Sequence, residues 1–271
     1  MEEGMPRANR HYIPGYVWHI THRCHKGEFL LKFARDRRRY LQWLFEARKR
    51  YGLSVLNYAV TSNHVHLLVR DDGNRDVIPQ SIQLIAGRMG QEFNQRKSRK
   101  GAYWEDRYHA TAVETDEHLL QCLVYIDLNM VRAGVVEHPS EWAFSGYNEI
   151  QAHRERYALI DYDRLRDLLN FRSMDDLAAA YRGWIEESLN EGSHFRDERW
   201  TESIAVGSET FVKETKEKLG FKARGREVIG RDGRYELRES PASYKGIFGH
   251  ESAVLRPKNE YPWETSDLIS R

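Results

Sequence analysis

The segment 61–69 (TSNHVHLLV) constrains the fold of this chain more than any other. Its run of aliphatic and β-branched residues predicts a buried strand. Because side chains alternate between the two faces of a strand, His64 and His66 share one face and Val65 points to the other. Two imidazoles roughly 7 Å apart on one strand face can bind one divalent metal ion. The alternative is that both are ordinary, half-exposed strand histidines.

The flanking sequence predicts strands and helices in a fixed order. We expect strands at 16–21, 53–61, 63–70 and 109–113, and helices at 34–51, 79–95 and 117–129. Asp116 is the expected N-cap of the last of these helices. The order β-α-β-β-α-β-α indicates an α+β, ferredoxin-like antiparallel sheet with packed helices and one further helix. Because that fold serves many functions, the function has to be argued from particular residues.

Composition restricts the class of protein. The chain has 271 residues, of which 31% are charged, so we expect one large domain or one domain with an appendage. Two cysteines, Cys24 and Cys122, are too few for a disulfide framework or a cysteine-based zinc site. No apolar run approaches the roughly 18 residues of a membrane span, and residues 1–10 lack a signal-peptide core. These features predict a cytoplasmic protein without a membrane partner.

Charge is distributed unevenly along the chain, although the formal net charge is only +1. The segment 35–50 carries seven basic and two acidic residues, and 210–238 carries nine basic and five acidic residues. Such clusters either bind phosphate backbones or form solvated helix faces. The segment 103–108 (YWEDRY) combines aromatic residues with Arg107, which suits stacking on unpaired bases but also fits core aromatics beside a surface arginine.

Tyr125 and Asn129 supply a second half to the histidine motif. They lie four residues apart on the predicted helix 117–129 and therefore share a face. If this helix lies beside the strand 63–70, Asn129 adds a neutral oxygen to the two histidines. Open coordination by two nitrogens and one oxygen suits Mn or Mg. Tyr125 would then be one helical turn from the metal, where a phenolic oxygen is a competent nucleophile.

Three separated strings together resemble the REP-associated tyrosine transposases of the HUH superfamily of single-strand DNA transposases. They are NHVHLLV (63–69), GAYWEDRYHA (101–110) and YIDLNMVRAGVVEHPSEWAFSGY (125–147). The resemblance covers roughly residues 12–150 and implies an HUH endonuclease fold. It implies that His64 and His66 bind the metal, that Asn129 is the third ligand and that Tyr125 is the nucleophile. Where this chain has Met130, family members more often have proline.

The resemblance also implies a reaction. Tyr125 would cleave single-stranded DNA, often beside a hairpin, through a 5′-phosphotyrosine intermediate, and a 3′-hydroxyl would later rejoin the strands. The expected cofactor is a divalent metal, Mg or Mn, and the expected location is the cytoplasm in association with the nucleoid. From charge and position, the candidate DNA contacts are Arg37, Arg38, Arg39, Trp104, Arg107 and Arg132.

We expect two parts, a catalytic domain over 1–150 and a mostly helical C-terminal region over 151–271. In the second part, helices are predicted at 161–169, 174–189 and 208–219, the last capped by Ser208, and a short strand at 234–238. This region either binds flanking or hairpin DNA or packs as a stabilising subdomain.

Two other functions fit the same residues. One is a nickase that resembles relaxases and replication initiators, and the other is a domesticated, non-catalytic nucleic-acid-binding protein. Related transposases include monomers and homodimers, and the sequence is compatible with either.

Overall fold

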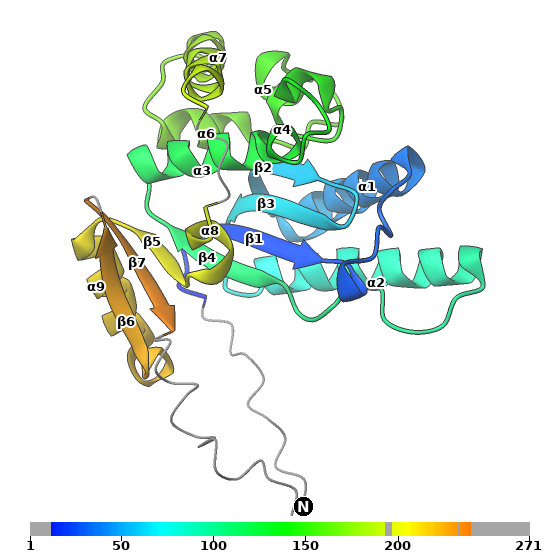
Figure 1. Cartoon of the computed structure of the whole chain (residues 1–271), viewed down its shortest axis with the longest axis horizontal. Helices are drawn as coiled ribbons and strands as arrows, with labels where there is room; N and C mark the ends of the chain where they lie inside the picture. Colours follow the sequence, from blue (N-terminus) through cyan, green and yellow to red (C-terminus); the bar gives the residue numbers. More distant parts are fainter. Residues whose placement is uncertain (1–11, 193–196, 232, 240–271) are drawn as a thin grey trace, which may run out of the picture.

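A computed structural model describes residues 12–192, 197–231 and 233–239 (Figure 1). Within these residues, seven strands form one sheet in the order β2-β3-β1-β4-β5-β7-β6. The strands are β1 (Val17–Arg23), β2 (Ser54–Val60), β3 (His64–Arg70), β4 (His109–Val113), β5 (Ala205–Gly207), β6 (Arg226–Arg231) and β7 (Arg234–Glu239). All neighbouring strands are antiparallel except β4 and β5, which are parallel, so the sheet is mixed.

The first four strands form the predicted ferredoxin-like sheet. Their order, β2-β3-β1-β4, and their antiparallel pairing confirm the expected fold class. Thr21 of β1 lies opposite His66 of β3 and opposite His109 of β4. Because opposite residues share a face, the register brings both histidines to one side of the sheet.

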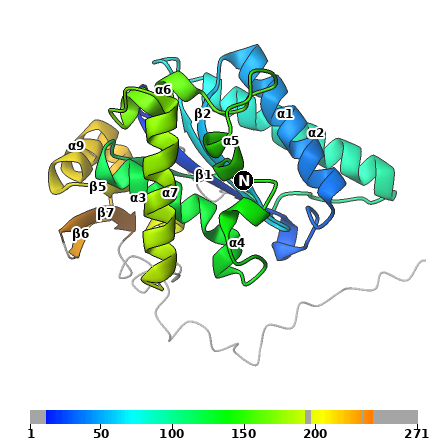
Figure 2. The same cartoon turned by 90° about the horizontal axis from the view of Figure 1, so that it is seen from above.

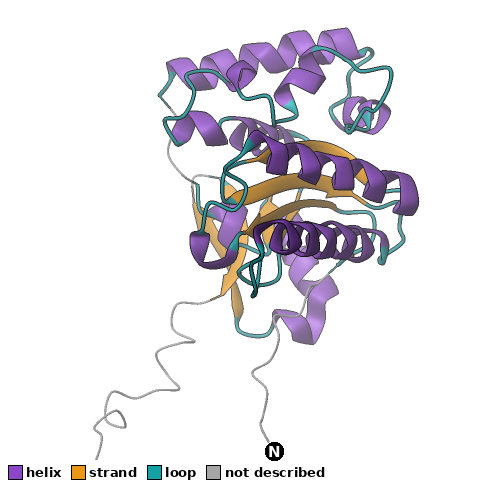
Figure 3. Cartoon of the chain, turned by 90° about the vertical axis from the view of Figure 1, so that its right-hand side faces the viewer, coloured by secondary structure: helices purple, strands orange, loops and turns teal. Residues whose placement is uncertain are grey.

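Helices α1 (Ala34–Tyr51) and α2 (Val77–Lys97) pack side by side on the other face of these strands (Figures 1 and 3). α1 has the predicted bounds and ends at Gly52, whose φ of 73° is the left-handed conformation that glycine adopts without strain. α2 begins two residues before the predicted start at Pro79. The short helix η1 (His25–Gly27) follows β1.

Helices from the middle of the chain pack against the first four strands and against one another (Figure 2). They are α3 (Glu117–Asp127), α4 (Asn129–Arg132), η2 (Pro139–Glu141), α5 (Tyr147–Gln151), α6 (Tyr162–Leu168) and α7 (Met174–Asn190). The predicted helix 117–129 is interrupted at Leu128, which separates α3 from α4. Asp116 is the N-cap residue of α3, as expected, but its φ is 73° and its side chain makes no capping hydrogen bond.

The C-terminal part extends the sheet and does not stand apart from it. After α6 and α7, its described residues contain α8 (Arg199–Glu202), α9 (Glu209–Leu219) and η3 (Gly220–Ala223) besides three strands. The predicted strand at 234–238 is β7, whereas β5 and β6 were not predicted. The side chain of Ser208 accepts a hydrogen bond from the Phe211 N–H, as expected of an N-cap. In the described ranges, no helix is long and apolar enough to cross a membrane.

Candidate active site

A cavity of about 540 Å³ opens where β1 and β3 meet α3 and α4. All four residues of the predicted metal and tyrosine site line it, namely His64, His66, Tyr125 and Asn129. The two histidines are on β3, and the break at Leu128 lets the chain turn between the tyrosine of α3 and the asparagine of α4. The structure therefore brings together side chains that are some sixty residues apart in the sequence.

His66 is buried and held by hydrogen bonds at both ring nitrogens. Its Nε2 lies 2.9 Å from Nδ2 of Asn129, and its Nδ1 lies 2.9 Å from Nε2 of His19. Because an amide nitrogen can only donate, Nε2 of His66 accepts and carries a lone pair. The lone pair of His66 Nε2 therefore points toward Asn129, which lines the cavity.

In His64, as in His66, Nε2 is the ring nitrogen that carries the lone pair. Its Nδ1 lies 2.7 Å from Oδ1 of Asn63 and 3.0 Å from the hydroxyl of Thr61. An amide oxygen only accepts, so Nδ1 carries the proton and Nε2 carries the lone pair. The rings of His64 and His66 are nearly perpendicular, with centroids 4.9 Å apart. In both histidines Nε2 is therefore the unprotonated ring nitrogen, the atom that could bind a metal.

Tyr125 is buried among aromatic rings. Its ring centroid lies 5.9 Å from that of His66, 6.0 Å from that of His19 and 6.1 Å from that of Trp200. The guanidinium carbon of Arg132 lies 4.2 Å from the centre of the tyrosine ring, and the same guanidinium donates to the Tyr125 carbonyl. Burial lowers the pKa of Arg132, although an arginine stays charged at physiological pH. A cation thus covers the face of the phenol ring.

Two residues at the site, His19 and Trp200, were missed by the sequence reasoning. His19 is fully buried, and its Nδ1 lies 2.9 Å from the carbonyl oxygen of Trp200. Burial lowers the pKa of His19 from 6.5 to about 3, so its ring is neutral. His19 stands in the predicted strand 16–21, and the alternation of that strand was the available signal. For Trp200 the sequence gave no signal, because its contacts depend on the distant C-terminal part.

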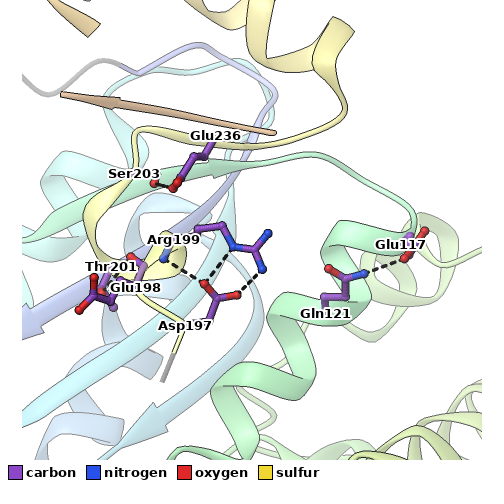
Figure 4. A network of polar contacts seen from close by, with 8 residues as sticks. All are labelled: Glu117, Gln121, Asp197, Glu198, Arg199, Thr201, Ser203 and Glu236. Atoms are coloured by element: carbon purple, nitrogen blue, oxygen red, sulfur yellow. Dashed lines mark hydrogen bonds and ion pairs between the residues drawn. The ribbon is translucent and has the colours of Figure 1, made fainter. Parts of the chain in front are cut away.

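The C-terminal segment 197–203 forms a wall of the cavity through Thr201 and Glu202. Figure 4 shows one ion pair within this segment and one hydrogen bond that joins its end to β7. Asp197 accepts hydrogen bonds from the Arg199 guanidinium, and Ser203 donates to Glu236 of β7. The segment therefore belongs structurally to the site.

The six predicted DNA contacts have different surroundings. Arg107 and Arg132 line the cavity, and Arg38 is exposed on α1. Arg39 forms a bidentate ion pair with Glu92, with distances of 2.5 Å from Nε to Oε2 and 2.6 Å from Nη2 to Oε1. Such a pair neutralises much of its charge.

Arg37 does not have the exposure that a phosphate contact needs. It is buried, donates to the carbonyl oxygens of Leu31 and Lys32, and lies over the rings of Trp142 and Phe144. The guanidinium therefore joins the start of α1 to the loop that precedes α5. The prediction that Arg37 contacts DNA is corrected to a packing role.

Trp104 is half-buried and packs against the core. Its ring stacks on His22 with a centroid distance of 4.0 Å, and its Nε1–H donates to the Ala86 carbonyl of α2. Since one face is covered by His22 and its polar atom is satisfied, Trp104 fits the alternative of a core aromatic better than a platform for bases.

The donor set of the cavity fits a divalent cation. Among residues 12–192, 197–231 and 233–239, no three or more His, Cys, Asp or Glu side chains form a metal-binding group. The candidate site instead combines two histidine Nε2 atoms with the amide of Asn129, whose Oδ1 is the atom suited to a metal. Such a neutral set leaves the charge of the ion uncompensated.

Comparisons with known proteins give a family match for part of the chain and several similar solved structures. Residues 15–129 match the family model described as "Transposase IS200 like". A similar solved structure is that of a REP-associated tyrosine transposase bound to a REP hairpin, with 20% identity and a TM-score of 0.47, covering 55% of this chain and 87% of that chain. A protein from Deinococcus radiodurans R1 assigned as a transposase has 18% identity and a TM-score of 0.32, covering 45% and 92%. None of the curated proteins matches this chain.

Proposed function

Residues 15–129 match the model of the IS200-like transposase family, and from this match and the geometry of the cavity we propose that the protein is a metal-dependent tyrosine transposase of single-stranded DNA. Its substrate is a single strand, at or beside a hairpin, which it cleaves and rejoins through a 5′-phosphotyrosine. The observation that carries this proposal is the meeting of Tyr125 with two histidines and Asn129 in one cavity.

His64, His66 and Asn129 would hold the divalent ion, Mg or Mn. When bound, the ion supplies Lewis-acid polarisation of the scissile phosphodiester. Both histidines present Nε2, and the Asn129 N–H already points at the lone pair of His66. A rotation about the last side-chain bond of Asn129 would turn Oδ1 toward the histidines, so the same amide could hold the ion.

Tyr125 is the proposed nucleophile. Its phenolic oxygen forms a bond to phosphorus while the bond from phosphorus to the 3′ oxygen breaks. The phenol loses its proton and the departing oxygen ends as a 3′-hydroxyl, so the exchange consumes no water and no ATP. The Arg132 guanidinium over the ring favours the phenolate, both when it attacks and when it leaves in the rejoining step.

The mouth of the cavity suits a phosphate backbone. Arg23 and Arg107 line it together with Arg132; the side chain of Arg23 is 63% exposed and lies 3.5 Å from Glu105, a single contact that a phosphate can replace. These cations can hold the phosphates that flank the scissile one. Among the predicted DNA contacts away from the cavity, exposed Arg38 stays a candidate.

A covalent-adduct assay tests the proposal. Wild type and Tyr125→Phe are incubated with labelled hairpin oligonucleotides from the flanks of the gene, with Mg or Mn and with EDTA. We expect a protein–DNA adduct that survives denaturation in wild type only, and its loss in EDTA. Hairpin binding by both proteins without any adduct, across several hairpins and both metals, would instead indicate a non-catalytic binding protein.

A further inference from the structure

His19 is a buried polar residue that the proposed reaction does not use. It is fully buried in the middle of β1, and both of its ring nitrogens make hydrogen bonds. One partner is His66, a proposed metal ligand, and the other is the backbone of Trp200 in the C-terminal part. Through these two hydrogen bonds, the position of the Trp200 carbonyl can determine the orientation of the His66 ring.

The register of the sheet explains why His19 meets His66. His66 lies opposite Thr21, so His19 is its diagonal neighbour on the same face. The two rings are nearly parallel, with an angle of 8° between them and centroids 5.1 Å apart. This arrangement holds the plane of the His66 ring as well as its Nδ1 atom.

The hydrogen bonds determine the tautomers of both rings. The Trp200 carbonyl only accepts, so Nδ1 of His19 carries a proton and donates over 2.9 Å. In the neutral ring Nε2 of His19 then has a lone pair, which accepts from Nδ1–H of His66 over 2.9 Å. Nε2 of His66 is therefore unprotonated and faces Asn129. Each step follows from the one before it, beginning with a backbone carbonyl.

We propose that His19 is the positioning residue of the metal site, which fixes His66 in the tautomer and orientation that ligate through Nε2. This inference rests on the proposed function of His66 as a ligand. Histidine ligands commonly donate their second ring N–H to another group, which sets their tautomer. Here the acceptor is a second, neutral histidine anchored on a carbonyl.

The anchoring carbonyl is itself held in place by β4. The hydroxyl of Thr111 lies 3.3 Å from the Trp200 carbonyl and 2.7 Å from that of Ser203. His109 also contacts the Ser203 carbonyl, at 2.9 Å. Because these contacts fix the end of α8, the C-terminal part determines the orientation of His19 and through it of His66.

The test reads the tautomer directly and needs no activity. Full-length protein with ¹⁵N-labelled histidine is prepared without metal, and the His66 signals are assigned with His66→Gln. We compare wild type with His19→Phe, which fills the space but cannot bond, and with His19→Gln, whose amide can accept from His66 and donate to Trp200. His118→Gln, on α3 beside Glu114, is the control for a histidine change away from the cavity.

We expect His66 to be protonated at Nδ1 in wild type, His19→Gln and His118→Gln. In His19→Phe the proton should move to Nε2 in much of the population, and the Mn²⁺ affinity, measured from the free-ion EPR signal, should fall 10- to 100-fold. Thr111→Val gives the same readout if His19→Phe does not fold, with a smaller shift expected because only the anchor is loosened.

An unchanged Nδ1-protonated His66 in His19→Phe, or in the folded Thr111→Val, would overturn the inference. The proposed function fails separately, through a wild type that binds no Mn²⁺ and forms no adduct. The tautomer measurement in metal-free protein still decides the role of His19 in that case.

Discussion

At the scale of single residues, the arginines show how surroundings decide a role that charge alone does not. Arg37 and Arg38 are neighbours on α1, yet the first is buried against Trp142 and Phe144 and the second is exposed. Arg132 was predicted as a phosphate contact, and the structure places it over the Tyr125 ring. The burial of Arg37 depends on the distant loop that carries Trp142 and Phe144. The position of Arg132 depends on the break at Leu128 between α3 and α4.

The position of Arg132 predicts a kinetic effect. Arg132→Gln removes the cation that favours the phenolate, so single-turnover adduct formation at saturating hairpin should slow by at least about tenfold, or about 1.4 kcal/mol. Arg132→Lys keeps the charge and should recover part of the rate. A variant that binds hairpin poorly but, once saturated, reacts at the wild-type rate would show that Arg132 only contacts DNA.

The burial of Arg37 predicts a stability effect. Arg37→Ala leaves the Leu31 and Lys32 carbonyls without their donor and removes the guanidinium from two rings, which should cost about 2 kcal/mol of unfolding free energy in urea. The matched variant Arg38→Ala should change stability by less than about 0.5 kcal/mol. Equal stabilities with weakened hairpin binding in Arg37→Ala would restore its predicted role in DNA contact.

At the scale of elements, a buried carboxyl group joins the tyrosine helix to its neighbours. Asp127 at the end of α3 accepts hydrogen bonds from Tyr181 of α7 and from Asn57 of β2, the latter over 3.1 Å. Burial raises the pKa of Asp127 from 3.8 to about 7, despite these donors. The folded protein therefore binds this proton more tightly than the unfolded chain does.

This difference gives a pH dependence of defined sign. Between about pH 4 and 7 the unfolded chain loses the Asp127 proton and the folded protein keeps it, so stability falls as pH rises and levels off above pH 7. In Asp127→Asn the side chain at this position does not titrate, so this contribution to the pH dependence is absent. Relative to wild type, its unfolding free energy in urea should rise by a few kcal/mol between pH 4.5 and pH 8. A difference that is the same at both pH values would contradict the raised pKa.

The sequence predicts helix and strand bounds well where nearby residues determine them, and less well where distant parts of the chain do. Gly52 ends α1 at the predicted residue, and β4 has its predicted bounds. The interruption at Leu128 was missed because the apolar spacing on both sides of it is helical. The strand β5 has three residues, too few to show alternation, and it forms only because β4 and β7 flank it.

At the scale of the whole molecule, one sheet runs through both predicted parts. The site therefore depends on residues that the boundary at 150 would assign to different domains, such as His19 and Trp200. The pair His64 and His66 with Tyr125 and Asn129 could be predicted, because strand and helix spacing place them. The chain of hydrogen bonds from Trp200 through His19 to His66 could not be predicted, because local sequence patterns do not reveal which distant strands pair.

The continuous sheet predicts cooperative unfolding. Since β5 pairs with β4 and with β7, the two parts should unfold in one transition that coincides by circular dichroism and tryptophan fluorescence. Two separated transitions, with the second retained in a fragment of residues 1–150, would support independent domains.

Locating the covalent bond in the protein–DNA adduct tests most directly whether Tyr125 is the nucleophile. The adduct formed with hairpin DNA is digested with nuclease and trypsin and fragmented in the mass spectrometer. The tryptic peptide 108–132 contains two tyrosines, Tyr108 and Tyr125, so fragmentation has to separate them. We predict a nucleotide joined through its 5′ phosphate to Tyr125. A nucleotide on Tyr108, or joined through a 3′ phosphate, would contradict the account.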